Sequence, residues 1–202
     1  MAGVIARMNR RAKKSSYLVC LFFLSAVALA QERLTLQCDP AQTSANIILS
    51  ATLHTVHGSF RSRQCELHFN PATGAISGEI VFDAASGNTG NEGRDKKMHK
   101  DVLESSRYPE IGFRPDRVEG KVAQGAPATL QVHGMFRIHG AEHEMTIPVE
   151  AKLAGDHWSA DCKFKVPYVA WGMKNPSKPF LHVSDTVDIE FHGEGKLAGI
   201  TP

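Results

Sequence analysis

The sequence lacks the short motifs by which many enzymes and metal sites are recognised. Its four cysteines lie far apart and include no Cys-x-x-Cys pair, so their spacing indicates no zinc or redox centre. No Gly-x-Ser-x-Gly segment provides a setting for a hydrolytic nucleophile. We therefore expect neither catalysis nor a cofactor, and a metal- or thiol-dependent enzyme is the weakest alternative that stays open.

Ten histidines are present, but their placement does not indicate a metal site. His139 and His143 are four residues apart, yet Gly140 predicts a turn there rather than a helix face. His133 and His139 lie on one strand face, which rarely supplies the three or four converging ligands that zinc requires. We expect no metal.

The sequence also has no apolar run of the roughly 20 residues that a membrane-spanning helix needs. The longest run, 17–29, follows a segment with basic but no acidic residues and precedes a small-x-small site at 28–30. This order is typical of a secretory signal peptide. We predict a signal peptide at 1–30 with cleavage near Ala30, a periplasmic or secreted location, and a mature domain over 31–202 without a transmembrane segment.

Positive charge is scarce once that leader is set aside. The whole chain carries 23 Lys and Arg against 21 Asp and Glu, and the five basic residues of the leader reduce the first number to 18, so the mature chain is near −3. The pattern retains no basic run that would indicate nucleic acid or an anionic membrane surface as a partner.

Most of 31–202 alternates between apolar and polar residues with a period of two, which predicts antiparallel strands with one dry and one wet face. Short turns join neighbouring strands closely, as an up-and-down meander requires. Pro148 falls on an outward face, where its missing backbone N–H indicates an edge or a bulge. We expect about eight strands, over 34–38, 46–54, 64–69, 76–83, 130–138, 144–153, 158–166 and 187–192, and the segment 111–118 would add one.

The segment 87–113 departs from this alternation. Its glycines and asparagines predict a loop, and from about Arg94 to Leu103 the four-residue spacing of Met98 and Val102 predicts a short amphipathic helix. Pro109 ends the helical pattern. We expect such a helix in an all-β chain to cap one end of a barrel or sandwich.

Cys38, Cys65 and Cys162 all fall on apolar strand faces. Two interpretations stay open. All three are buried small hydrophobes, or two form a disulfide, which a secreted location permits, and the third is a free thiol.

The strand pattern fits a closed barrel or a two-sheet sandwich, with a filled or a hollow core. An eight-stranded barrel is just wide enough to be filled by side chains or to hold one small ligand. Inward glycines such as Gly78 and Gly134 either leave a lumen or mark strand bends. An outer-membrane barrel is excluded, because charged residues such as Glu79, Arg137 and Lys163 lie on the outer face, where lipid would sit.

Three blocks of the sequence resemble the YceI-like family. The first is 86–95 (SGNTGNEGRD) with Met98, His99, Tyr108, Pro109 and Phe113, the second is 132–140 (VHGMFRIHG), and the third is 171–173 (WGM) with 183–187 (VSDTV). The blocks follow the family's order, and the resemblance covers about 34–197. It implies an all-β fold, an antiparallel up-and-down lipocalin-like barrel with a short capping helix, in an extracytoplasmic protein that holds isoprenoid lipids.

The predicted inner faces carry no charged residue, which suits a long hydrocarbon ligand. The resemblance implies a quinone or prenyl phosphate as the class of bound lipid. A non-catalytic structural or interaction barrel with a filled core is the alternative. The candidate lining residues are Ile47, Leu49, Leu53, Ile80, Phe82, Phe113, Val132, Phe136 and Trp171.

Arg94 completes the candidate site at the mouth, with two interpretations. It contacts a ligand head group, or it pairs with a strand-end carboxylate while Asp95 favours the helix N-terminus. The loop 171–179 departs from the shorter closing loop of the family, so the length of the lipid stays open. A homodimer that pairs through an edge strand is also open.

Overall fold

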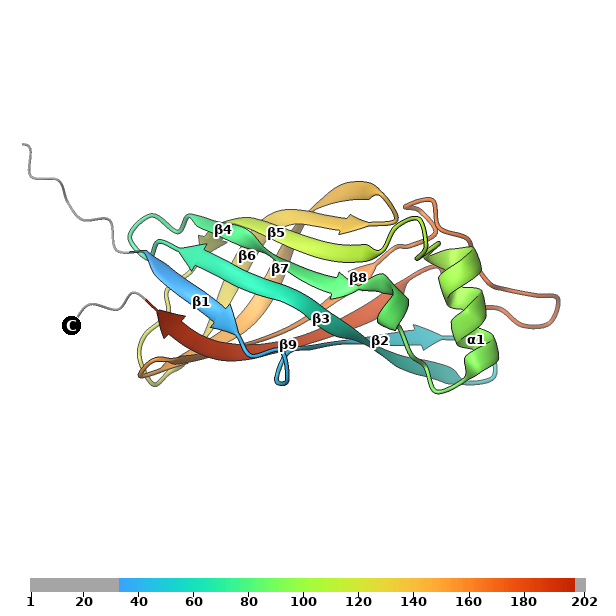
Figure 1. Ribbon diagram of the computed structural model, residues 1–202, viewed down its shortest axis with the longest axis horizontal. Helices are drawn as coiled ribbons and strands as arrows, with labels where there is room; N and C mark the ends of the chain where they lie inside the picture. The colour runs from blue at the N-terminus through green and yellow to red at the C-terminus, as the bar shows by residue number, and fades with distance from the viewer. Residues whose placement is uncertain (1–32, 199–202) are drawn as a thin grey trace, which may run out of the picture. The chain divides into compact units, whose positions relative to one another are not determined.

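Strand pairing closes the chain into a barrel in the computed structural model, which describes residues 33–198 (Figure 1). Eight of the strands pair in sequence order around a ring, and the last pairs back with the first of the eight. Every pairing is antiparallel, so the predicted up-and-down, lipocalin-like barrel is confirmed. The nine strands are β1 (Leu34–Cys38), β2 (Ser44–Ser50), β3 (Thr55–Phe69), β4 (Ile76–Asp83), β5 (Glu110–Glu119), β6 (Pro127–Ile138), β7 (Ala141–Ala154), β8 (His157–Val166) and β9 (Val187–Ala198).

β1 and β2 share one position in the ring, between β3 and β9. β2 pairs with the first half of β3, and β1 pairs with its second half. β9 is divided in the same way, since β2 pairs with its first half and β1 pairs with its second half. At the break between them, the hydroxyl of the buried Thr43 donates to the backbone oxygen of Asp39 over 2.8 Å. Nine strands therefore fill eight positions.

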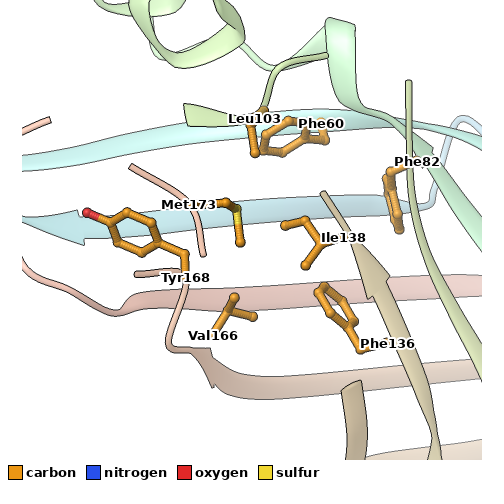
Figure 2. Close-up of a cluster of buried hydrophobic side chains, with 8 residues drawn as sticks. All are labelled: Phe60, Phe82, Leu103, Phe136, Ile138, Val166, Tyr168 and Met173. Carbon is orange, nitrogen blue, oxygen red and sulfur yellow. The ribbon is translucent and has the colours of Figure 1, made fainter. Parts of the chain in front are cut away.

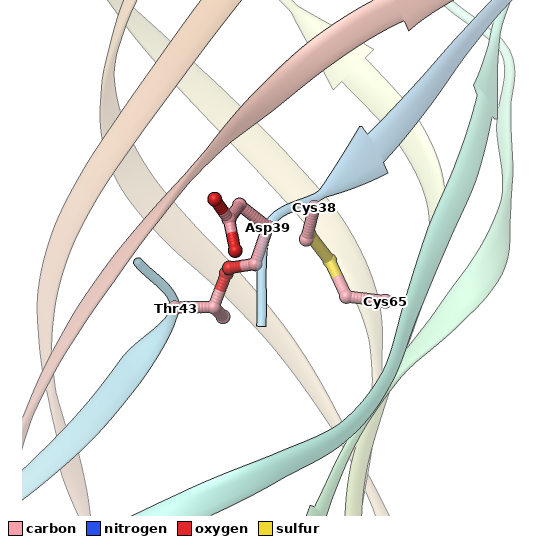
Figure 3. The surroundings of a disulfide bond; sticks show 4 residues. All are labelled: Cys38, Asp39, Thr43 and Cys65. Carbon is pink, nitrogen blue, oxygen red and sulfur yellow. A yellow bond between two sulfur atoms is a disulfide. The ribbon is translucent and has the colours of Figure 1, made fainter. Parts of the chain in front are cut away.

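A disulfide between Cys38 and Cys65 joins β1 to β3 beside this break (Figure 3). Of the two interpretations of the cysteines, the structure has one bridge plus a thiol, because Cys162 is free.

Bulges explain where the strand prediction was wrong. The structure starts β3 at Thr55, nine residues before the predicted 64, and a bulge lies between Ser62 and Gln64. Before the bulge even-numbered residues such as Phe60 face inward, and after it odd-numbered residues such as Leu67 do, so no single period of two spans the strand. The additional strand predicted at 111–118 is β5, which has a similar bulge between Pro115 and Arg117.

Gly78 and Gly134 allow neighbouring strands to approach each other. A Cβ added at Gly78 would collide with the backbone oxygen of Glu66, and one added at Gly134 would collide with that of Arg114. The close approach of the backbones therefore requires glycine at these two positions.

The β7–β8 ladder is short and leaves part of β7 as an edge. It covers Val149–Ala154 only, and Pro148 is the residue just before it. A residue without a backbone N–H thus lies where the ladder stops, as its position on the outer face predicts.

The predicted capping helix consists of α1 (Glu92–Lys97) and a π-helical turn, η2 (Met98–Val102), after a short 3₁₀ turn, η1 (Ala84–Ser86). It begins two residues before Arg94, because the side chain of Asn91 caps it by accepting a hydrogen bond from the backbone N–H of Arg94 at 2.9 Å. Figure 1 places α1 at one end of the barrel. We call this end, which also carries the β2–β3 and β8–β9 connections, the helix end.

A cluster of buried side chains packs inside the barrel toward the helix end (Figure 2). Aromatic pairs hold it together: Phe136 meets Phe164 edge to face at 5.7 Å between ring centroids, and Phe82 meets Phe191 at 6.2 Å. Its buried members are Phe60, Phe82, Leu103, Phe136, Ile138, Val166, Tyr168 and Met173.

The predicted signal peptide and its cleavage site lie outside the described residues. Within 33–198, no helix has the length and apolar character to cross a membrane.

Candidate functional site

A cavity of about 600 Å³ runs inside the barrel. Its volume lies in the range of about 300–1,000 Å³ that is typical of small-molecule sites. All eight ring positions contribute to its wall, and most of the lining residues are aliphatic or aromatic. No Asp or Glu of the described residues lines it. The interior can therefore take up a hydrocarbon without leaving a carboxylate buried and unpaired.

Most of the candidate residues come together on this wall. They come from four strands of the ring, β2, β4, β5 and β6, and from the start of the helix. The candidates that line the cavity are Ile47, Leu49, Ile80, Phe82, Phe113, Val132, Phe136 and Arg94. Their role in binding stays a prediction.

Leu53 does not line the cavity, and its expected inward position was wrong. β2 ends at Ser50, so Leu53 lies in the turn that follows, where its side chain is 78% exposed. In the sequence, the apolar positions Ile47, Leu49 and Ala51 continue with the same period of two to Leu53, although the strand has already ended.

Trp171 is also not among the lining residues. Its indole stacks on the imidazole of His143 at 3.8 Å between centroids and lies 5.9 Å from the ring of Phe136. His143 belongs to the part of β7 that has no ladder with β8. Trp171 therefore packs against the barrel beside this edge. Burial lowers the pKa of His143.

Arg94 lies at the helix end of the cavity and is held by the preceding loop. Its Nε donates to the hydroxyl of Thr89 at 2.7 Å, and its Nη2 donates to the backbone oxygen of Thr89 at 2.8 Å. Asp95 accepts hydrogen bonds from the same threonine. No carboxylate of the described residues forms an ion pair with Arg94, so the expected strand-end pairing was wrong. The guanidinium is thus fixed in the wall while Nη1 has no hydrogen-bond partner among the described residues.

Two lysines that sequence reasoning missed join Arg94 at this end. Lys97 lines the cavity and donates to the backbone oxygen of Pro176 at 3.2 Å, which ties the helix to the β8–β9 loop. Lys178 of the same loop and His54 of the β2–β3 turn also line the cavity. The spacing of three residues between Arg94 and Lys97 was the available signal, because it places both on one helix face. We call Arg94, Lys97 and Lys178 the cationic rim.

Two titratable groups on the wall are held in their neutral forms. Burial raises the pKa of the Cys162 thiol to about 12, and Asp161 adds to this effect. Burial also raises the pKa of Tyr168 to about 12, and its hydroxyl donates to the backbone oxygen of Ser184 at 2.8 Å. A thiol protonated at neutral pH is a poor nucleophile, so Cys162 serves as apolar lining.

The outer wall carries a separate charged group around His133. Its Nδ1 lies 2.7 Å from Asp116 and its Nε2 lies 2.8 Å from Glu144. The hydrogen bond to Asp116, followed by that to Glu144, raises the pKa of His133. Within residues 33–198, no three His, Cys, Asp or Glu side chains are grouped so as to hold a metal ion.

The closed meander and its apolar interior define the class of protein: a hollow, lipocalin-like antiparallel barrel. The chain belongs to the family of the YceI-like domain, whose model matches residues 36–195.

Solved structures share this fold. BcnA from Burkholderia cenocepacia is 22% identical, with a TM-score of 0.65 over 79% of this chain and 99% of that chain. A polyisoprenoid binding domain from Saccharophagus degradans, implicated in plant cell wall breakdown, is 15% identical, with a TM-score of 0.65 over 82% of this chain and 98% of that chain. The YCEI protein of Campylobacter jejuni is 17% identical, with a TM-score of 0.58 over 72% and 86%. No curated protein matches the chain.

Proposed function

We propose that the chain is an extracytoplasmic binding protein that holds one long-chain lipid, of the isoprenoid class, in the barrel cavity. The observation that carries this proposal is the combination of an apolar cavity of about 600 Å³ with a cationic rim at one end. The tail of the lipid lies in the barrel, and its head group lies at the rim.

The apolar wall supplies enough free energy for such a tail. Each buried CH₂ contributes about 0.8 kcal/mol, so ten of them contribute about 8 kcal/mol, which corresponds to roughly micromolar affinity before ordering costs. The ligand therefore needs few polar contacts inside the barrel.

The cationic rim selects the class of head group. Arg94 presents a guanidinium, which suits a phosphate or another oxygen anion, and Lys97 and Lys178 add positive charge without a neighbouring lining carboxylate. A prenyl phosphate fits this rim better than a neutral quinone does. The name of the Saccharophagus degradans domain supports an isoprenoid tail.

The disulfide supports the extracytoplasmic part of the proposal. Disulfides persist in oxidising compartments and are rare in the cytosol, so a bridge between Cys38 and Cys65 suits a periplasmic or secreted protein. It agrees with the signal peptide predicted at 1–30.

The proposed mechanism is sequestration, which requires no covalent step. The barrel shields the tail from water and leaves the head group accessible at the helix end. The protonated thiol of Cys162 suits this role, because an apolar wall without a reactive nucleophile leaves the cargo unchanged.

Native mass spectrometry of the chain purified from its own host tests the proposal. We expect a bound mass that solvent extraction releases and identifies as an isoprenoid lipid. A ligand-free mass, with no uptake of added prenyl phosphate or quinone, would overturn the proposal and favour a purely structural barrel.

A substitution inside the cavity should remove the cargo. Ile80 lines the wall, and Ile80→Asp places a carboxylate where the tail lies, so we expect retention of the lipid to be lost. Ser77→Asp is the matched control, because Ser77 is exposed on the same strand. Full retention in a folded Ile80→Asp variant would contradict the assignment of the cavity.

A further inference from the structure

Two large apolar side chains are fully or mostly exposed in the described part of the chain, and both lie at the helix end. Phe180 is 100% exposed and Leu53 is 78% exposed. Phe180 belongs to the β8–β9 loop, which projects beside α1 in Figure 1, and Leu53 belongs to the β2–β3 turn. We call these two residues the apolar tip.

Hydrogen bonds hold the two loops of the apolar tip together. The backbone N–H of Thr52 donates to the oxygen of His182 at 2.9 Å, and the N–H of His182 donates to the hydroxyl of Thr52 at 3.0 Å. One residue further, Ala51 and Val183 form a β-bridge. The tip is thus an ordered extension of the barrel wall, with its two apolar side chains on adjoining loops.

The backbone at Phe180 is strained, and its ring is fully exposed to solvent. Lys178 and Leu181 exchange two backbone hydrogen bonds of 3.0 Å, which makes residues 178–181 a tight turn with Pro179 in the second position. Phe180, in the third position, has a φ of 69°, a left-handed conformation that glycine adopts far more easily than a bulky residue. Backbone strain of this kind is concentrated at functional sites.

The two loops that carry the tip have a positive net charge. The segments 51–58 and 171–184, which contain the tip, include Lys174 and Lys178 and no acidic residue. The nearest carboxylate after them, Asp185, accepts a hydrogen bond from the side chain of Asn175 at 2.6 Å. The sequence has no basic run, but the fold brings Lys178 to the same cavity mouth as Arg94 and Lys97 of α1, which also carries Glu92 and Asp95.

The tip also adjoins the opening through which a lipid would pass. Lys178 and His54 line the cavity and are exposed, so the cavity reaches the surface between the two loops that carry Phe180 and Leu53. Apolar residues that insert among acyl chains, flanked by lysines that contact anionic head groups, are the features by which a protein binds at a bilayer surface.

We propose that the apolar tip docks the barrel on a lipid bilayer that contains anionic lipids, with the cavity mouth facing the membrane. Phe180 and Leu53 enter the interfacial region, and Lys174 and Lys178 contact the head groups. This inference extends the proposed function by adding the surface from which the lipid is taken up or to which it is delivered.

Flotation with vesicles tests the docking, using the full chain as its host processes it. We compare vesicles of phosphatidylcholine alone with vesicles that also contain phosphatidylglycerol, and we expect the chain to float with the second kind. Replacing both tip residues, as Leu53→Ser with Phe180→Ser, should lower this binding by at least about tenfold, because both apolar contacts are lost. Replacing Lys174 and Lys178 by Gln should lower it by about fivefold per lysine, and only on the anionic vesicles.

Two further variants make the test specific. Ile48→Ser removes an apolar residue from the outer wall, outside the tip and the cavity lining, and should float as the unchanged chain does. Phe180→Gly relieves the left-handed strain, so we expect it to raise the midpoint of thermal unfolding while it lowers vesicle binding. A misfolded protein would not show that combination.

The outcomes separate this inference from the proposed function. Failure of the unchanged chain to float, or equal flotation of the tip variants, overturns the docking, whatever lipid mass spectrometry finds in the cavity. Self-association that depends on Phe180, without flotation, would assign the tip to a second copy of the chain and overturn the docking as well.

Discussion

At the scale of single residues, His133 on the outer wall lies between two carboxylates. Asp116 and Glu144 accept from its two ring nitrogens, at 2.7 and 2.8 Å, and they outweigh the opposing effects of burial and of the neighbouring Arg117. Because both carboxylates favour the imidazolium, folding raises the pKa of His133 above its usual 6.5.

This pKa shift predicts how stability depends on pH. A raised folded-state pKa gives a stabilisation that is fully present below about pH 6.5 and is lost as the pH rises through the folded-state pKa. We therefore expect the free energy of unfolding to fall with rising pH in this window more steeply for the unchanged chain than for His133→Gln. Chemical unfolding at a series of pH values measures both slopes.

A second variant tests whether Asp116 and Glu144 cause the pKa shift of His133. Asp116→Asn combined with Glu144→Gln keeps the imidazole but removes both negative charges, and it should flatten the slope as His133→Gln does. The pKa of His143 is lowered by burial and has the opposite effect on the slope, but it is common to all three proteins. Equal slopes in all three would assign the pH dependence to another group.

At the scale of elements, glycine has opposite roles in the strands and in the helix. Gly134 lies opposite Pro115, beside the bulge of β5, where an added Cβ would collide with the backbone of Arg114. Gly93 lies exposed in α1, where an added Cβ would make only an ordinary contact at 3.5 Å with the side chain of Asn91.

The same substitution should therefore have opposite effects in the two elements. We expect Gly134→Ala to lower the free energy of unfolding by about 1–3 kcal/mol, because the strands must move apart. We expect Gly93→Ala to raise it by about 0.5–1 kcal/mol, because alanine loses less backbone entropy in a helix. Urea unfolding of both variants measures the difference, and a stabilising Gly134→Ala would show that β5 and β6 are further apart than described.

At the scale of the whole molecule, the disulfide holds the divided ring position in place. It closes a loop of 27 residues and attaches β1, a strand of five residues, to β3. A loop of this length corresponds to about 3–4 kcal/mol of stabilisation through the entropy of the unfolded chain.

Reduction of the bridge should lower the free energy of unfolding by that amount. The variant with both Cys38→Ser and Cys65→Ser should match the reduced chain and should not respond to added reductant. If reduction changes stability in the double variant as well, the effect does not come from this disulfide.

The fold class could be predicted from the sequence because each strand of an antiparallel barrel has one apolar and one polar face. Apolar and polar residues therefore alternate along the sequence with a period of two. The prediction was wrong where the period changes without a local signal. The bulge at Ser62 hides the first half of β3, and the alternation through Leu53 continues past the end of β2. Most of the candidate residues do line the cavity for the same reason, as Ile80 and Phe136 show, since a residue on the apolar face of a barrel strand lies inside the barrel.

The rim and the tip depend on contacts between segments that are far apart in the sequence. The hydrogen bond from Lys97 to Pro176 joins α1 to the β8–β9 loop, and those between Thr52 and His182 join two loops at the helix end. No local pattern encodes either contact. The pairing of Cys38 with Cys65 likewise requires the register that places Leu36 opposite Leu67. Trp171 lies outside the cavity because the β7–β8 ladder stops at Val149, and its ring stacks on His143 in the part of β7 that this leaves unpaired with β8.

The closure of the ring affects the order in which the barrel can fold. Neighbours from β3 to β9 are joined by connections along the chain, some as short as the turn between Ile138 and Ala141, but Ser44 pairs with His192 across nearly the whole domain. Closing that pair costs about 3 kcal/mol more loop entropy than closing a short hairpin. Local hairpins should therefore form early, and the joining of β9 to β1 and β2 should limit the folding rate. The disulfide joins only β1 and β3, so it can form before β9 pairs with the other strands. It then holds β1 beside β3, in the position where β1 pairs with β9.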